Sequence, residues 1–207
     1  MRVRVLAALV YALMTAGVAA AQNSRAEILF AQEMKKKCSD VKSIRCRFVQ
    51  TRSSSVLVHD VQKRGTYSFL QPYNVLLAFD DGDYIKITSA MFEIKQNGHT
   101  TATKAGSNPM LRNLNRILSA CISGDAAQIT SGFDTEITAS DDEFTVRLLP
   151  MRGRTNKKSP QTLLVFARKD MSLRSMSIEQ ASGDMLRYEF HDVKYNADID
   201  AAMFDIQ

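Results

Sequence analysis

The chain has 207 residues, of which 24% are charged and 45% are hydrophobic, and its formal net charge is +5. Two of the positive charges, Arg2 and Arg4, lie in an N-terminal segment that we expect to be removed, which leaves +3. A protein so close to neutral is not expected to bind nucleic acid.

The N-terminus has the pattern of a secretory signal peptide. A basic start precedes an apolar run over residues 5–18, and three alanines follow at 19–21. This pattern predicts cleavage after Ala21. A membrane anchor is the alternative, but the run is shorter than the ~20 residues that a spanning helix needs. No cysteine follows the run directly, so we expect no lipid anchor. The sequence therefore predicts a signal peptide at 1–21 and one domain over 22–207.

Two segments have helical patterns. Residues 24–38 begin with a capping box at Ser24 and Glu27 and carry an apolar stripe. Residues 107–122 have a broad apolar face, and Gly124 follows where a helix would end. We expect both to be amphipathic helices that pack an apolar face against something else.

Most of the remaining chain alternates between apolar and polar residues. Ile44, Cys46 and Phe48 point one way, and Arg45 and Arg47 point the other, which is the period of a strand with one buried face. The same alternation predicts strands at about 41–51, 55–60, 63–70, 73–80, 84–88, 92–96, 132–139, 143–150, 161–168, 172–180 and 185–195.

Consecutive strands of this kind form an antiparallel sheet, and a sheet of ~10–11 strands tends to curl. The apolar face of such a sheet must be covered. We therefore predict a mainly β (α+β) fold, with a single curved antiparallel sheet that forms an incomplete β-barrel. The two helices would close its concave face.

The sequence offers no catalytic constellation. The three histidines, His59, His99 and His191, are not in metal-ligand spacing with one another or with a cysteine. Neither a nucleophile elbow nor a phosphate-binding loop is present. We therefore expect a protein that is not an enzyme and that has no catalytic residues, cofactor or metal site.

Apolar surface is what the sequence has instead. The residues that could line the concave face are Tyr67, Phe69, Val75, Leu77, Phe79, Ile85 and Ile87, and those that could cap it are Met110, Leu114, Ile117 and Leu118. The alternative is an ordinary close-packed core. The three cysteines allow one disulfide, for which Cys38 and Cys46 are the nearest pair, or three buried thiols.

Several short motifs occur in a characteristic order along the chain. They are Val41, Ser43, Phe48 and Gln50 in V-x-S-x-x-x-x-F-x-Q, then Gly65, Pro72, the Asp81-Gly82 turn, and the ending Ile199-Asp200-Ala201-Ala202-Met203-Phe204. In this order the chain resembles the LolA family of periplasmic lipoprotein carriers.

The resemblance implies a periplasmic, monomeric chaperone that shields the acyl chains of lipoproteins. Such a carrier takes acylated lipoproteins from an inner-membrane lipoprotein-releasing transporter and passes them to an outer-membrane acceptor. The apolar residues named above, together with Phe48, then become candidate acyl-chain contacts, with Val75 and Leu77 the best placed. Gln71 stands where better-known carriers have the arginine that ties the lid helices shut, so Gln71 is the candidate for that role here.

Three other functions fit parts of the pattern. A lipid- or lipoprotein-sensing regulatory domain could have the same half-barrel, and so could a carrier of another lipid or of a pigment precursor. An exported hydrolase is disfavoured by the missing catalytic groups.

Overall fold

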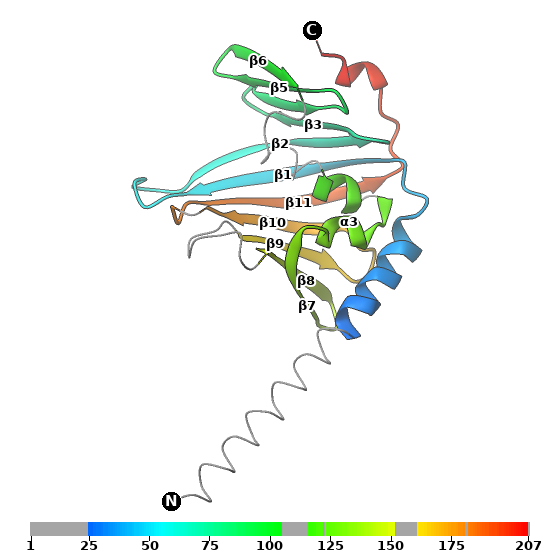
Figure 1. Ribbon diagram of the computed structural model, residues 1–207. Coiled ribbons are helices and arrows are strands. Elements are labelled where there is room, and N and C mark those ends of the chain that lie inside the picture. The colour runs from blue at the N-terminus through cyan, green and yellow to red at the C-terminus, as the bar shows by residue number, and fades with distance from the viewer. Residues whose placement is uncertain (1–24, 105–115, 122, 152–160, 181, 207) are drawn as a thin grey trace, which may run out of the picture.

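The computed structural model describes residues 25–104, 116–121, 123–151, 161–180 and 182–206. Its body is one 11-stranded antiparallel sheet (Figure 1). The strands are β1 Ser43–Ser53, β2 Val61–Leu70, β3 Asn74–Phe79, β4 Tyr84–Ile87, β5 Met91–Gln96, β6 His99–Lys104, β7 Phe133–Ala139, β8 Glu143–Pro150, β9 Gln161–Ala167, β10 Leu173–Glu179 and β11 Met185–Tyr195. The predicted single, open, mainly β sheet is confirmed.

The sheet consists of two meanders that meet in its middle. The spatial order is β6-β5-β4-β3-β2-β1-β11-β10-β9-β8-β7, so all neighbouring pairs except β1–β11 are consecutive in the chain. β1 and β11 pair from Ile44↔Tyr195 to Ser53↔Met185, with an irregularity between Arg45 and Arg47. The strands at the two edges of the sheet are β6 and β7.

Three helical segments accompany the sheet. The first covers residues 25–38, and residues 116–121, the described part of the predicted helix at 107–122, are also helical. A short helix, α3, covers Ala126–Thr130 and begins with Asp125, whose side chain accepts a hydrogen bond from the Gln128 amide. None of the described helices is long and apolar enough to cross a membrane.

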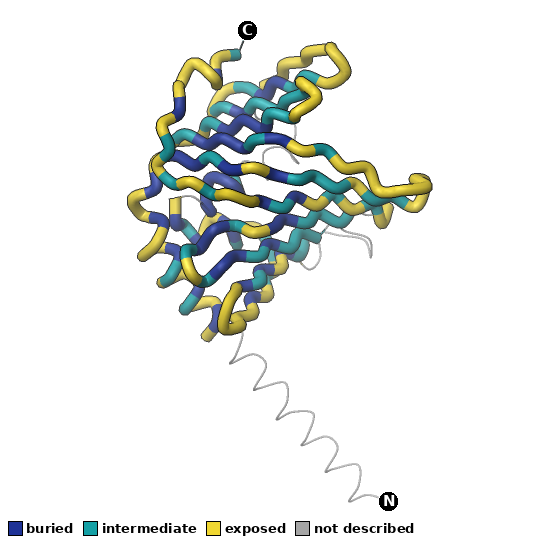
Figure 2. The backbone as a smooth tube through the Cα atoms, turned by 180° about the vertical axis from the view of Figure 1, so that it is seen from behind, coloured by how far each residue is buried: buried dark blue, intermediate teal, exposed yellow. Residues whose placement is uncertain are grey.

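The helices cover the inner face of the sheet, as Figure 1 shows. Phe30 of the first helix packs with ring centroids 5.4 Å from Phe144 of β8 and 5.2 Å from Phe166 of β9. Ile117 and Leu118 of the second helix, and Ile129 of α3, belong to the same buried cluster. Figure 2 shows the sheet from the opposite, outer side. The helices therefore close the concave face, as predicted.

The C-terminal segment packs on the outer face. It contains a 3-10 helix, η1, over Ala201–Phe204. Phe204 and Ile199 bury against Leu76 of β3 in a cluster separate from the main core. The outer face of β3 is thus covered by the end of the chain.

Two predicted features differ from the structure. The strand expected at 55–60 is wrong, because these residues form the loop at the end of the β1–β2 hairpin. The edge strand β6 was not predicted, since all six of its residues are exposed and its sequence HTTATK does not alternate between apolar and polar residues.

Candidate functional site

The inner face of the sheet is a continuous apolar surface. Directly opposed residues in an antiparallel sheet lie on the same face. The register gives three rows, which are Phe48↔Gly65↔Phe79, Tyr67↔Leu77↔Ile85 and Phe69↔Val75↔Ile87. All eight sheet residues that the sequence nominated therefore lie on this one face. Six of them are buried, and Phe79 and Ile85 are only partly buried.

The nominated helix residues are only partly within the described chain. Ile117 and Leu118 are buried against the sheet. Met110 and Leu114 lie outside the described residues. Of the four helix residues predicted to cap the inner face, the two that are described do pack against it.

A small cavity remains between the second helix and the sheet. Its volume is about 40 Å³, and its lining comes from Leu118 and Cys121 on the helix, from β1, β2, β10 and β11, and from the turn after β9. Such a volume accommodates only a few water molecules. The helix at 116–121 therefore packs closely on this part of the inner face, and a long ligand would have to displace it there.

Gly65 brings β2 and the Phe48 ring together. A Cβ atom at this position would lie 2.2 Å from the Ala78 carbonyl oxygen and 2.7 Å from Cζ of Phe48. Side chains essentially never approach so closely, so only glycine fits here. The missing side chain lets the Phe48 ring lie over the backbone of β2, where it also packs 5.2 Å from the ring of Phe79.

The Tyr67 hydroxyl is buried beside this cavity. Tyr67 is 3% exposed, and its hydroxyl has no hydrogen-bond partner within the described part of the chain. Burial, together with the nearby thiols of Cys46 and Cys121, raises the pKa of the Tyr67 phenol well above its usual value. By contrast, the equally buried Tyr188 accepts a hydrogen bond from the Gln50 side chain at 2.6 Å. The Tyr67 hydroxyl is thus a polar group that is buried in an apolar site without a hydrogen bond.

The first helix is attached to the sheet by charges. The guanidinium of Arg168, in the turn after β9, lies 3.0 Å from the Glu33 carboxylate, and Lys37 lies 3.3 Å from the same carboxylate. Burial alone would raise the pKa of Glu33, but the hydrogen bonds from these two cations outweigh it and lower the pKa below its usual value. Arg168 also donates to the Ser140 carbonyl at 2.8 Å and stands over the Phe144 ring. One arginine therefore links the helix to two turns of the sheet.

Comparison with known proteins identifies the architecture. The family model of the outer membrane lipoprotein carrier protein LolA matches residues 39–207. The chain belongs to the LolA family. The resemblance found in the sequence is thereby confirmed. A search of the curated proteins found no match.

Several solved structures resemble the chain at low sequence identity. An uncharacterized conserved protein from Thermus thermophilus is 8% identical, with a TM-score of 0.52 over 86% of this chain and 92% of that one. A LolA superfamily protein from Nitrosomonas europaea is 12% identical, with a TM-score of 0.43 over 85% and 97% of the two chains. A putative outer membrane lipoprotein-sorting protein domain from Vibrio parahaemolyticus is 9% identical, with a TM-score of 0.47 over 85% and 94%.

Gln71 is the residue for which the sequence predicted a role in lid closure. Its side-chain amide donates to the Val41 carbonyl at 2.8 Å, and its backbone amide donates to the Lys42 carbonyl at 2.9 Å. Both acceptors lie in the short segment between the first helix and β1. Gln71 therefore holds the connection between the first helix and β1, and its role in lid closure stays a prediction.

The first and second helices meet at Gly124. A Cβ atom at this residue would lie 2.9 Å from the Met34 carbonyl and 3.2 Å from the Cβ atom of Cys38, both on the first helix. Its φ of +71° is a conformation that L side chains rarely adopt. The end of the second helix is thus seated directly on the first.

All three cysteines are buried, free thiols in the structure. This arrangement is the second of the two alternatives that the cysteine count left open. Burial raises the pKa of Cys38 to about 11 and that of Cys46 to about 12. Thiols with such pKa values are almost entirely protonated at neutral pH and react slowly.

Sequence reasoning missed two features of this site. The unpaired Tyr67 hydroxyl could not be found, because only the folded structure shows what surrounds it. The anchoring pair of Glu33 and Arg168 joins residues that are 135 positions apart. Glu33 lies within the predicted helix at 24–38 and Arg168 ends the predicted strand at 161–168, and neither position signals that the two side chains meet.

Proposed function

We propose that this protein is a chaperone that binds the acyl chains of lipoproteins and carries them from the inner to the outer membrane. The observation that carries the proposal is the continuous apolar inner face of the sheet, closed by helices, in a member of the LolA family. The binding function needs no catalytic group, and we propose that the protein is not an enzyme.

The closed inner face gives a physical basis for reversible binding. Moving a ~16-carbon acyl chain out of water contributes about 0.8 kcal/mol per methylene, which is on the order of 10 kcal/mol. To admit the chain, the helices at 25–38 and 116–121 must leave part of the sheet, and this exposes their own apolar residues. The cost of opening offsets part of the gain, so the cargo can be released again.

The proposed place of action is the periplasm, between the two membranes. A signal peptide at residues 1–21 would export the chain to the periplasm. There the protein would receive acylated lipoproteins from an inner-membrane transporter, move as a monomer, and deliver them to an outer-membrane acceptor. Nucleic acids, cofactors and metals have no part in this cycle.

A binding experiment with matched variants tests the proposed face. Ile85 is partly buried on the inner face of β4, and Leu70 is partly buried on the outer face of β2. Fluorescence anisotropy with a fluorescent triacylated lipopeptide should show binding by the wild type. Ile85→Glu should weaken this binding at least tenfold, because the charge would lie against the acyl chain. Leu70→Glu makes a comparable change on the other face and should bind as the wild type does.

Circular dichroism and gel filtration must show that both variants remain folded. Equal affinity of the Ile85→Glu variant and the wild type would remove the inner face from the proposal. Equal weakening by both variants would show an effect on stability rather than on binding.

Mass spectrometry of the protein purified from its native envelope separates the carrier from the alternative functions. Triacylated lipoprotein bound to the protein supports the carrier. Free lipid without protein cargo supports a carrier of another lipid. A protein that contains neither would favour the sensing domain.

A further inference from the structure

The end of the β1–β2 hairpin presents apolar side chains to solvent. Val56 is 86% exposed and Val58 is 90% exposed, and Leu57 between them is 37% exposed. Val61, at the start of β2, is 47% exposed. Single exposed apolar residues are common, but three in succession at the end of a hairpin have no structural purpose in a monomer.

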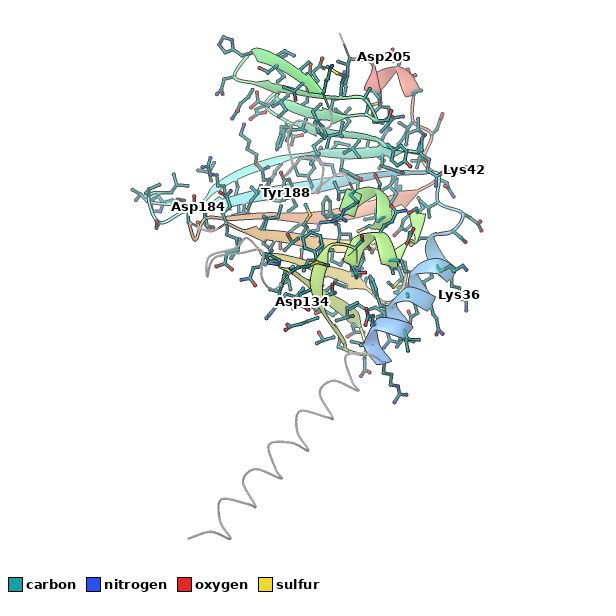
Figure 3. The ribbon with its side chains drawn as sticks, viewed as in Figure 1. Lys36, Lys42, Asp134, Asp184, Tyr188 and Asp205 are labelled. Carbon is teal, nitrogen blue, oxygen red and sulfur yellow. The ribbon has the colours of Figure 1, made fainter. Side chains whose placement is uncertain are left out.

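The hairpin carries this apolar tip beyond its neighbouring strands. On one side β3 ends opposite Gly65, and on the other side β11 begins opposite Ser53. The loop at 54–60 therefore projects beyond the ends of the neighbouring strands, as Figures 1 and 2 show. The Ser54 hydroxyl donates a hydrogen bond to the Asp184 carboxylate in the turn before β11, which fixes the base of the loop. Figure 3 labels Asp184.

Two exposed arginines flank the tip, Arg52 near the end of β1 and Arg64 near the start of β2. Lys63 beside them is paired with two aspartates of the β3–β4 turn. Asp60 lies in the loop, and Asp184 at its base interacts with Arg52. An apolar tip above exposed arginines matches the surface of an anionic membrane, where apolar groups enter the interface and cations meet the headgroups.

The composition of the tip fits a lipid surface better than a protein partner. Specific protein interfaces bury about 800 Å² on each partner and depend on tryptophan, tyrosine and arginine at their centres. Residues 54–60 contain no aromatic residue and no arginine, and a hairpin end offers a small area. Shallow insertion into an interface needs neither a large area nor shape complementarity.

We propose that the β1–β2 tip docks the protein reversibly on anionic phospholipid membranes, with Val56, Leu57 and Val58 in the interface and Arg52 and Arg64 at the headgroups. The inference rests on the proposed function only in that a lipoprotein carrier must work at membranes. The contact is weak because the inserted side chains are few and small. Weak contact suits a protein that must leave each membrane again.

Vesicle flotation tests the proposal without any lipoprotein. The full-length mature protein should float with vesicles of phosphatidylethanolamine and phosphatidylglycerol at low salt, and much less with phosphatidylcholine vesicles. Val56→Asp combined with Val58→Asp should lower the bound fraction at least tenfold. Arg64→Gln should lower the affinity about fivefold, the amount expected for one basic residue near such a surface.

Ile28→Asp is the matched control. Ile28 is 57% exposed on the first helix, so this change replaces a different exposed apolar residue with a charge. Its bound fraction should equal that of the wild type. The proposal is overturned if the wild type fails to float with anionic vesicles, or if the double aspartate variant floats as well as the wild type. It is also overturned if the Ile28 variant loses binding equally.

The lipopeptide assay keeps this proposal distinct from the proposed function. The double aspartate variant should bind the triacylated lipopeptide with wild-type affinity, because its substitutions lie outside the inner face. Failure of the wild type to bind the lipopeptide would refute the carrier proposal. Membrane docking would still be decided by the flotation experiment alone.

Discussion

Replacing Tyr67 with phenylalanine should make the protein more stable. The substitution removes one hydroxyl and keeps the ring that packs 5.8 Å from Phe190. That hydroxyl is buried without a hydrogen-bond partner in the described chain. A buried, unsatisfied polar group costs about 1–3 kcal/mol, because folding strips its water without replacement.

The expected gain is about 1 kcal/mol in the free energy of unfolding. We take the low end of the range because the phenol hydroxyl is neutral, and the larger costs belong to charged groups. For a protein of 207 residues, this gain corresponds to a rise of about 2–4 °C in Tm. Urea unfolding followed by circular dichroism and a thermal melt would measure both quantities.

Tyr188→Phe is the matched control for this experiment. Tyr188 is 2% exposed and Tyr67 is 3% exposed, so the same atom is removed from two equally buried sites. The Tyr188 hydroxyl accepts from Gln50 at 2.6 Å, so its loss leaves the Gln50 amide without that acceptor. This variant should be destabilised by about 1–2 kcal/mol. The two variants should therefore shift Tm in opposite directions.

A loss of stability in Tyr67→Phe as large as that in Tyr188→Phe would refute the reasoning. It would mean that the Tyr67 hydroxyl makes a favourable interaction in solution. The proposed uncompensated polar group would then not exist.

Three further changes test other parts of the structure. Gly65→Ala should lower the free energy of unfolding by about 2 kcal/mol, since its Cβ atom has no room, and an unchanged urea midpoint would contradict this. The lowered pKa of Glu33 adds stability above its usual value of 4.5, and this stability is lost as the pH falls through the lowered pKa. Glu33→Gln, which keeps the neighbour Arg168, should flatten the fall in Tm between about pH 7 and pH 3, and parallel profiles would count against the ion pair. The thiols of Cys38 and Cys46 should react with Ellman's reagent only when the helices open, so the rate should level off with reagent concentration. A rate like that of free cysteine would contradict their burial.

The sequence predicted the sheet well where one face of a strand is buried. The bounds of β8 and β11 match the expected strands residue for residue, because their apolar residues alternate. The same alternation placed all eight nominated residues of the site on the inner face. The helix end at Gly124 was also predicted, since glycine tolerates the positive φ found there.

The sequence did not predict features that depend on contacts between distant parts of the chain. The residues Val56-Leu57-Val58 have high strand propensity, but the neighbouring strands end before them, so the hairpin turns there. The edge strand β6 is the opposite case, a strand that the sequence did not predict. It forms because it pairs with β5, although its own residues do not alternate between apolar and polar. The cavity beside Tyr67 depends on residues from β1, β2, β11 and a helix, and no single stretch of sequence encodes it.

The pairing of β1 with β11 in the middle of the sheet bears on how the chain folds. Each meander can form from hairpins between neighbouring strands, but the seam between them joins residues about as far apart as the domain allows, from Ser53 with Met185 to Ile44 with Tyr195. Closing so long a loop is slow, and the seam cannot form before residue 195 has been synthesised. During translation the first meander therefore waits with one edge of β1 unpaired. Until β11 arrives, that free strand edge can pair with another chain.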